Sequence, residues 1–210
     1  MARVRVSGAG LLPAMTGPKL AARFGINGRD EACPSRYHDG IHIEAQHIDT
    51  AALLLRLSFG LSIFAHGYNK MFGKGGIDRT AKWFGGIGMR WPKTQARLAS
   101  LTEQGSGIAL VLGLATPIAS AALIALMVVA IVVTHRHNGY FIFRPGEGWE
   151  YCAAIASVAA VIALIGPGGW SVDSALDLTY SNWASFTVAI GLGVGSAIAQ
   201  LAIFWRPKPM

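Results

Sequence analysis

The stretch that decides the fold is Asp49-Thr-Ala-Ala-Leu-Leu-Leu-Arg56-Leu-Ser-Phe-Gly60-Leu-Ser-Ile-Phe-Ala-His66-Gly67-Tyr-Asn-Lys70-Met71. It is apolar and reaches the roughly 20 residues that a helix needs to cross a bilayer. Positions 56, 59, 63, 66 and 70 recur every three or four residues, so a helix places Arg56, His66 and Lys70 on one stripe. Charged groups that face lipid are costly, and ionisable residues in such helices therefore face other helices. The stretch predicts a transmembrane helix with a polar stripe directed into a bundle.

The composition supports a membrane protein. The 210 residues are 52% hydrophobic and 14% charged, whereas soluble domains average about 25% charged residues. Residues 1–97 hold 14 of the 18 Lys and Arg residues, and between 98 and 205 only Arg136 and Arg144 are basic. These residues lie in a tail and in loops rather than on one continuous face of a folded module. The pattern excludes a nucleic-acid partner and favours contact with a lipid bilayer.

The apolar segments predict an all-α, polytopic membrane bundle with five crossings. A polar and aromatic connection over residues 72–97, with Trp83, Phe84 and Trp91, is typical of an amphipathic segment at the membrane surface. In the last segment, Gly191-Leu-Gly193-Val-Gly195 follows no strand, so we interpret it as a small-residue packing motif rather than a nucleotide loop. The expected crossings are residues 50–71, 98–114, 118–134, 149–165 and 181–205.

Residues 1–48 read as a polar N-terminal extension. They contain no continuous apolar run of the kind found in a signal peptide, so we expect the first crossing to direct insertion. Residues 33–47 contain several potential ligands, yet their spacing matches no zinc signature and we predict no metal site there. The two cysteines, Cys33 and Cys152, form no CxxC motif, and we expect free thiols. The membrane orientation stays open, because two groups of basic residues give opposite answers. Placing the basic loops between the crossings in the cytoplasm would leave the basic N-terminal extension outside.

The residues that could carry chemistry lie on neighbouring crossings. Glu103 lies within the second crossing, and antiparallel neighbours bring it closer to His66 and Lys70 than to Arg56. In one interpretation His66 and Glu103 are catalytic and handle protons in a pocket for a polar small molecule such as a quinone. In the other, they form a buried structural strut and Lys70 extends to the membrane surface.

A second polar cluster follows the third crossing. It contains His135, His137, Glu147 and Glu150, and the helix order places it at the same end of the bundle as the first cluster. We predict His135, Glu150, Lys70 and Arg56 as substrate-binding residues. Arg56 lies deeper than the others, and we expect it to pair with helix-end carbonyls or with an acidic residue of the opposite loop. The sequence lacks the repeated ExxH pairs of di-iron bundles, and we predict no metal in the pocket.

Several ordered motifs resemble the DoxX family of small bacterial integral membrane proteins. The resemblance extends over roughly residues 50–178 and implies a four-helix membrane core, which we place at 49–178. It leaves the 1–48 extension and an additional helix with a basic tail, 179–210, outside the family pattern. The motifs are Arg56-Leu-x-x-Gly60, His66-Gly67-x-x-Lys70, Trp83-Phe84, Glu103 followed by Gly107, Gly113-Leu-Ala-Thr-Pro117, Asn138-Gly139-Tyr-Phe-Ile-Phe and Gly166-Pro-Gly168-x-x-Ser-Val-Asp173.

The resemblance also implies an association with redox chemistry. Some family members are subunits of a thiosulfate:quinone oxidoreductase, and actinobacterial members are linked to a membrane complex with a superoxide dismutase and a sulfurtransferase. We therefore predict a redox-associated subunit of an oxidoreductase complex in the bacterial plasma membrane, with quinone as the candidate cofactor and other redox proteins as partners. The alternative is a non-catalytic scaffold that recruits partner proteins. A small-solute transporter is a third possibility, disfavoured because no inverted repeat is visible.

Overall fold

The computed structural model describes residues 35–178 and 180–207, and the fold in this part of the chain is helical. Residues 42–210 form one compact unit. No β-strand occurs among the described residues, so the predicted all-α class is confirmed. The helices are α2 (Ser35–Phe72), α3 (Gly76–Gly86), α4 (Pro92–Leu112), α5 (Thr116–Ala130), the π-helical turn η1 (Ile131–His135), α6 (Glu150–Ile165), α7 (Val172–Ala175) and α8 (Asn182–Phe204).

Helix α2 begins well before the predicted crossing. It includes residues 35–48, which the sequence analysis assigned to a polar extension, while residues 1–34 lie outside the described part. Between Gly40 and Gly60 the sequence has neither glycine nor proline, so nothing interrupts the helix as it continues from the polar into the apolar segment. Its part that is apolar enough to span a membrane is Gln46–Phe72.

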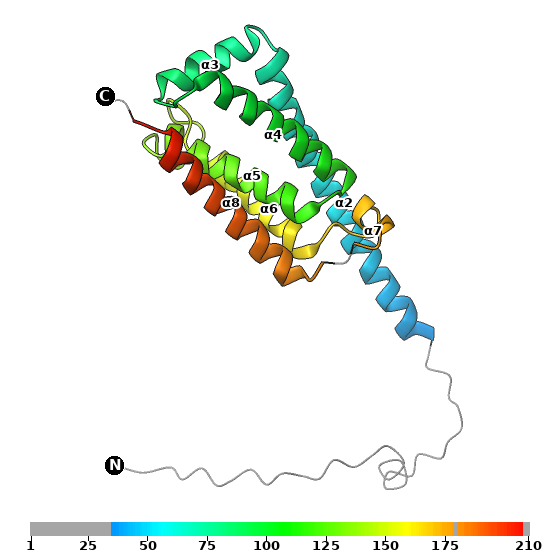
Figure 1. Cartoon of the computed structure of the whole chain (residues 1–210). Coiled ribbons are helices and arrows are strands. Elements are labelled where there is room, and N and C mark those ends of the chain that lie inside the picture. Colours follow the sequence, from blue (N-terminus) through cyan, green and yellow to red (C-terminus); the bar gives the residue numbers. More distant parts are fainter. Residues whose placement is uncertain (1–34, 179, 208–210) are drawn as a thin grey trace, which may run out of the picture. The chain divides into compact units, whose positions relative to one another are not determined.

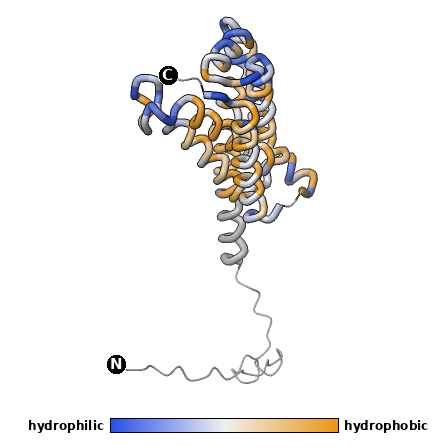
Figure 2. Tube along the Cα trace, turned by 60° about the vertical axis from the view of Figure 1, so that its left-hand side comes forward, coloured by the Kyte–Doolittle hydropathy of each residue, from blue (hydrophilic) through white to orange (hydrophobic). Residues whose placement is uncertain are grey.

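Five helices occupy the five predicted crossings, and three of them are long and apolar enough to cross a membrane. These three are Gln46–Phe72, Thr116–His135 and Asn182–Phe204. Helix α6 is apolar but has only 16 residues, and α4 has 21 residues but a more polar sequence. Figure 2 shows the hydrophobic residues along the helices and the hydrophilic residues gathered mainly at their ends and connections. The fold is that of a helical membrane bundle.

The helices form two groups (Figure 1). Helices α5, α6 and α8 pack on one another, and α3 packs on α4 in the other group, where α4 also contacts α2 and α5. The central core between them contains Ile63, Leu110, Leu123, Ile155 and Ile162, all almost completely buried. Figure 1 shows the two groups diverging toward the end at which α3 lies.

Helices α2 and α4 touch through glycines. A Cβ atom added to Gly107 of α4 would lie 2.7 Å from the Gly60 carbonyl oxygen and 2.8 Å from the Phe64 nitrogen of α2. One added to Gly67 would lie 2.8 Å from the Glu103 Cβ. The backbones therefore approach as closely as in other small-residue contacts of membrane helices. This contact brings the polar stripe of α2 directly against Glu103.

We expect Gly107→Ala to destabilise the protein, because its methyl group would meet backbone atoms that cannot move independently of α2. The cost of such overpacking is about 1–3 kcal/mol. Gly105→Ala on the same helix is the matched control, since nothing lies within 4 Å of a Cβ there and alanine is the better helix former. The measurement is the melting temperature in detergent. Equal melting temperatures for the two variants would contradict this packing account.

Helix α8 is part of the bundle. Its Gln200 side-chain nitrogen donates to the Gln95 side-chain oxygen of α4 at 2.9 Å. Beyond the helix end, the Trp205 indole donates to the Ile87 carbonyl at 2.8 Å, and backbone hydrogen bonds join residues 204 and 206 to residues 90 and 88. The predicted fifth helix thus closes the bundle against the connection between α3 and α4.

Helix α3 is the amphipathic segment predicted between the first two crossings. Ala81 and Phe84 face inward and are buried, while the neighbouring Trp83 is 46% exposed. Asp78 on the outer side pairs with Lys93 of α4 at 2.9 Å, and this hydrogen bond lowers the pKa of the Asp78 carboxyl group. Helix α3 thus covers one end of the space between the two helix groups.

Candidate functional site

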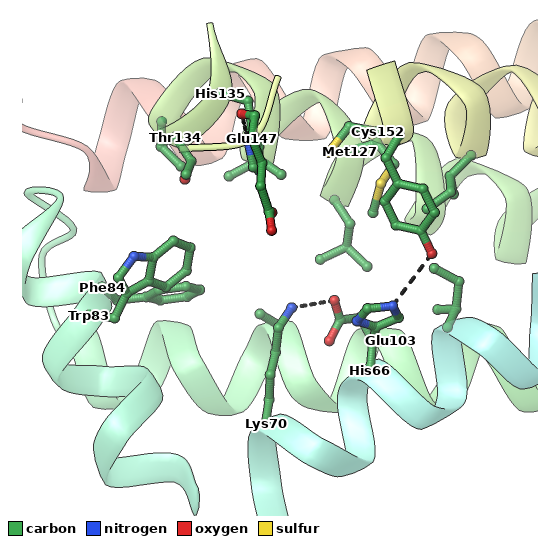
Figure 3. Close-up of a pocket in the computed structure, with 18 of the residues that line it drawn as sticks. His66, Lys70, Trp83, Phe84, Glu103, Met127, Thr134, His135, Glu147 and Cys152 are labelled. Carbon is green, nitrogen blue, oxygen red and sulfur yellow. Dashed lines mark hydrogen bonds and ion pairs between the residues drawn. The ribbon is translucent and has the colours of Figure 1, made fainter. Parts of the chain in front are cut away.

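A cavity of about 490 Å³ lies between the two helix groups at the end covered by α3 (Figure 3). Helices α2, α3, α4, α5, α6 and α8, the η1 turn and the loop before α6 all contribute to its lining. The walls are mostly apolar, with a small number of polar groups directed inward. Its polar or reactive lining residues are His66, Lys70, Glu103, Thr134, His135, Glu147, Tyr151, Cys152 and Gln200.

On the wall formed by α2 and α4, Lys70 and Glu103 form an ion pair. The Glu103 side chain is 5% exposed and that of Lys70 is 31% exposed, so the pair joins a buried carboxylate to a partly hydrated ammonium group. One Glu103 oxygen, Oε2, is buried without a hydrogen-bond partner among the described residues. His66 lies one turn before Lys70 and lines the same wall. The structure thus brings together His66, Lys70 and Glu103.

The facing wall carries His135 and Glu147. His135 ends the π-helical turn η1, a local widening of the helix that is frequent at functional sites. Its Nδ1 atom lies 2.9 Å from the Glu147 carbonyl oxygen. A carbonyl only accepts hydrogen bonds, so Nδ1 carries the proton, and in the neutral ring Nε2 is an acceptor.

Glu147 has an unusual backbone. It lies between Gly146 and Gly148 and has a φ of 60°, in the left-handed region that non-glycine residues rarely adopt. Figure 3 shows its side chain extending into the cavity from the wall opposite Lys70. Strained backbone at a cavity is a frequent mark of a functional residue. The sequence placed Glu147 in the second polar cluster but did not predict it as a substrate-binding residue, and the structure places it in the cavity lining.

Tyr151 and Cys152 enter the cavity from the start of α6. The Tyr151 hydroxyl lies 3.4 Å from His66 Nε2 and 3.5 Å from the Ser62 hydroxyl. Cys152 is a buried free thiol, as predicted for this residue, whereas Cys33 lies outside the described residues. Sequence analysis missed Tyr151. Tyr151 lines the cavity although it is 42% exposed, so it does not belong to the buried face of α6 formed by Cys152, Ile155 and Ala159.

Glu150 lies outside the cavity lining. Its Oε2 atom accepts a hydrogen bond from the Ile142 backbone nitrogen at 3.1 Å, which holds the loop before α6. The helix phase explains the difference, because residues 151 and 152 face inward and residue 150 therefore points elsewhere. On this helix Tyr151, and not the predicted Glu150, lines the cavity with Glu103 and His66.

Arg56 also lies apart from the cavity, near the opposite end of the bundle. It is 1% exposed, and its Nη2 atom donates to the Trp170 carbonyl at 2.6 Å. Asp173, which is fully buried nearby, accepts from the Ala115 nitrogen at 2.7 Å and from the Thr116 nitrogen and hydroxyl at 3.0 and 2.8 Å. Asp173 thus caps α5 from a distant loop. This cluster holds the α4–α5 turn, the loop after α6 and helix α2 together.

No group of three or more His, Cys, Asp or Glu side chains in the described ranges, 35–178 and 180–207, is arranged to hold a metal ion. The cavity's polar groups are instead spread over facing walls, with the Lys70–Glu103 pair on one and His135 and Glu147 on the other. Tyr151 also lines the cavity, with its hydroxyl 3.4 Å from His66 Nε2. Such an arrangement suits a ligand with a polar head and an apolar body.

Fold and cavity together define a helical membrane protein with a mostly apolar cavity that carries a few polar groups. The DoxX family model matches residues 51–136, which confirms the predicted resemblance over this range. The matched range runs from the apolar part of α2 to the end of η1 and includes His66, Lys70, Glu103 and His135. No curated protein and no solved structure matches the chain. The protein is a helical membrane protein that is similar to the DoxX family over this range.

Proposed function

We propose that the cavity binds a quinone and that the protein is a redox-associated subunit of an oxidoreductase complex in the bacterial plasma membrane. The observation that carries this proposal is the meeting of His66, Lys70, Glu103 and Tyr151 in one largely apolar cavity within a membrane bundle. A quinone has a polar ring and an apolar tail, and it reaches such a cavity through the lipid phase.

The cavity has the dimensions and chemistry that a quinone ring needs. Ligand pockets commonly enclose about 300–1,000 Å³ with apolar walls and a few polar groups, and this cavity encloses about 490 Å³. Trp83 and Phe84, whose ring centroids lie 5.1 Å apart, provide aromatic surface on one side. Lys70 and the Tyr151 hydroxyl provide hydrogen-bond donors for a quinone carbonyl.

His66 and Glu103 are the proposed proton-handling residues. Quinone redox chemistry moves protons together with electrons, and it requires groups that change protonation near the ring. Glu103 is buried beside Lys70, and His66 is in contact with the Tyr151 hydroxyl. The electron-transferring part of the complex would reside in partner redox proteins, as the family resemblance implies.

A cavity-filling variant tests the proposal. Ala130 lines the cavity, and we expect Ala130→Phe to abolish saturable binding of a short-tailed quinone to the protein in lipid nanodiscs, because the ring occupies the ligand volume. Ala154→Phe is the control, since residue 154 is exposed on α6 and does not line the cavity. Binding is measured by quenching of tryptophan fluorescence. Equal quinone affinity in both variants would refute the proposal.

A second candidate function is that of a scaffold, and one feature of α8 favours it. Gly191 and Gly195 lie one turn apart on the exposed side of this helix, with nothing within 4 Å of an added Cβ, whereas Gly193 packs on Ile124. A GxxxG spacing of this kind supports close contact between membrane helices. We expect Gly195→Leu to remove a co-purifying membrane partner if the scaffold function holds, with quinone binding unchanged. Retention of every partner would argue against it.

A further inference from the structure

We infer that the cavity prefers the reduced, dihydroxy form of its ligand, a quinol, over the oxidised quinone. This inference rests on the proposed function, and it names the chemical form that the same cavity selects. It follows from which polar groups on the two walls donate hydrogen bonds and which accept them.

The wall formed by the loop before α6 offers acceptors. The proton on His135 Nδ1 is used by the Glu147 carbonyl at 2.9 Å, so the neutral ring turns an acceptor, Nε2, to other partners. When it is ionised, the Glu147 carboxylate has no hydrogen-bond donor and can only accept. Its side chain extends into the cavity (Figure 3). A ligand that meets this wall must therefore supply a donor.

The facing wall offers donors and one free acceptor, Glu103 Oε2, which is buried without a hydrogen-bond partner among the described residues. Lys70 has three N–H donors, and its ion pair with Glu103 engages one of them. The Tyr151 hydroxyl both donates and accepts, and it already lies near His66 Nε2. A ligand hydroxyl that meets this wall can accept from Lys70 and donate to Glu103 Oε2, whereas a carbonyl oxygen can only accept.

The two oxidation states of the ligand fit this pattern differently. A quinone has two carbonyl oxygens, which accept at both ends and would place lone pairs against His135 and Glu147. A quinol has a hydroxyl at each end, and each hydroxyl can donate to one wall or accept from the other. A buried acceptor without a partner favours a ligand with a hydroxyl over an analogue that lacks one. Glu103 Oε2 is such an atom, whereas His135 is half-buried and Glu147 is exposed.

Three probes of nearly the same shape test the inference: tetramethylhydroquinone, tetramethylbenzoquinone and the dimethyl ether of the hydroquinone, which has no hydroxyl donors. Binding is measured anaerobically in nanodiscs. We expect the hydroquinone to bind at least about tenfold more tightly than either analogue, which corresponds to one buried hydrogen bond of about 1.4 kcal/mol.

Glu147→Gln places an amide, which can also donate, on the acceptor wall, and we expect the preference for the hydroquinone to fall about tenfold or to reverse. Asp78→Asn is the control on α3, outside the cavity, and should keep the wild-type preference. Equal or tighter binding of the quinone by the wild-type protein would overturn the inference and leave the proposed function standing. Failure of all three probes to bind would instead overturn the proposed function.

Discussion

Asp173→Asn is expected to cost about 3–5 kcal/mol, the largest loss of stability from any single change considered for this protein, because it breaks a buried charge cluster. Asp173 is fully buried and accepts three hydrogen bonds from Ala115 and Thr116. Arg56 nearby is equally buried, and among the described residues its Nε and Nη1 atoms have no hydrogen-bond partner. Loss of the carboxylate leaves the guanidinium without a counter-charge.

The expected loss is a large part of the 5–15 kcal/mol that stabilises a typical protein. We therefore expect little folded Asp173→Asn protein in detergent extracts, as measured by thermal stability on size-exclusion chromatography. Asp177→Asn is the matched control, because Asp177 is exposed in the same loop. A melting temperature of the Asp173→Asn protein within a few degrees of that of Asp177→Asn would show that the cluster does not hold the loop to the bundle.

Glu103→Gln is expected to have the largest effect on function. Glutamine has nearly the same shape and can still accept a hydrogen bond from Lys70, and the partly exposed lysine can extend toward water. We therefore expect the folded protein to persist, while quinone-linked turnover of the assembled complex is abolished because the carboxylate no longer accepts protons. Turnover and the amount of folded protein are measured on the same preparation.

The structural alternative for Glu103 predicts the reverse pattern. If the ion pair only supports the bundle, Glu103→Gln should reduce the folded protein, and replacing both Lys70 and Glu103 by methionine should restore it. If the proposed function holds, the variant with methionine at both Lys70 and Glu103 should fold but have no quinone-linked turnover. Full turnover in either variant would remove Glu103 from the mechanism.

The sequence predicted the helices and one wall of the cavity well, because both depend on patterns within a single segment. The stripe of α2 correctly indicated that His66 and Lys70 face Glu103. Arg56 was also predicted to bind substrate, but it lies ten residues, or about 15 Å, before His66 on the same helix. Its expected contact with carbonyls or an acidic residue of the opposite loop agrees with its hydrogen bond to the Trp170 carbonyl and its proximity to Asp173. The structure places Arg56 with Asp173 near the other end, where only the folded loop after α6 brings the two together.

The facing wall depends on features that a pattern of residue types does not contain. The prediction chose Glu150, whereas the structure directs Tyr151 inward, because the phase of α6 is set by packing against α5 and α8. The π-helical turn at His135 and the left-handed backbone of Glu147 are likewise products of tertiary structure. The contribution of α8 to the bundle was also underestimated. Gln200 donates to Gln95, and Trp205 just beyond the helix donates to Ile87, and both hydrogen bonds join residues that are far apart in the sequence.

Photo-crosslinking with an azidoquinone in lipid nanodiscs, followed by mass spectrometry, tests most directly whether the cavity is a quinone site. The account predicts that labels concentrate on cavity segments, residues 63–70 and 126–135, and that excess unlabelled quinone removes them. Labels confined to the lipid-facing residues Leu192 and Ile198 of α8, and insensitive to competitor, would contradict it.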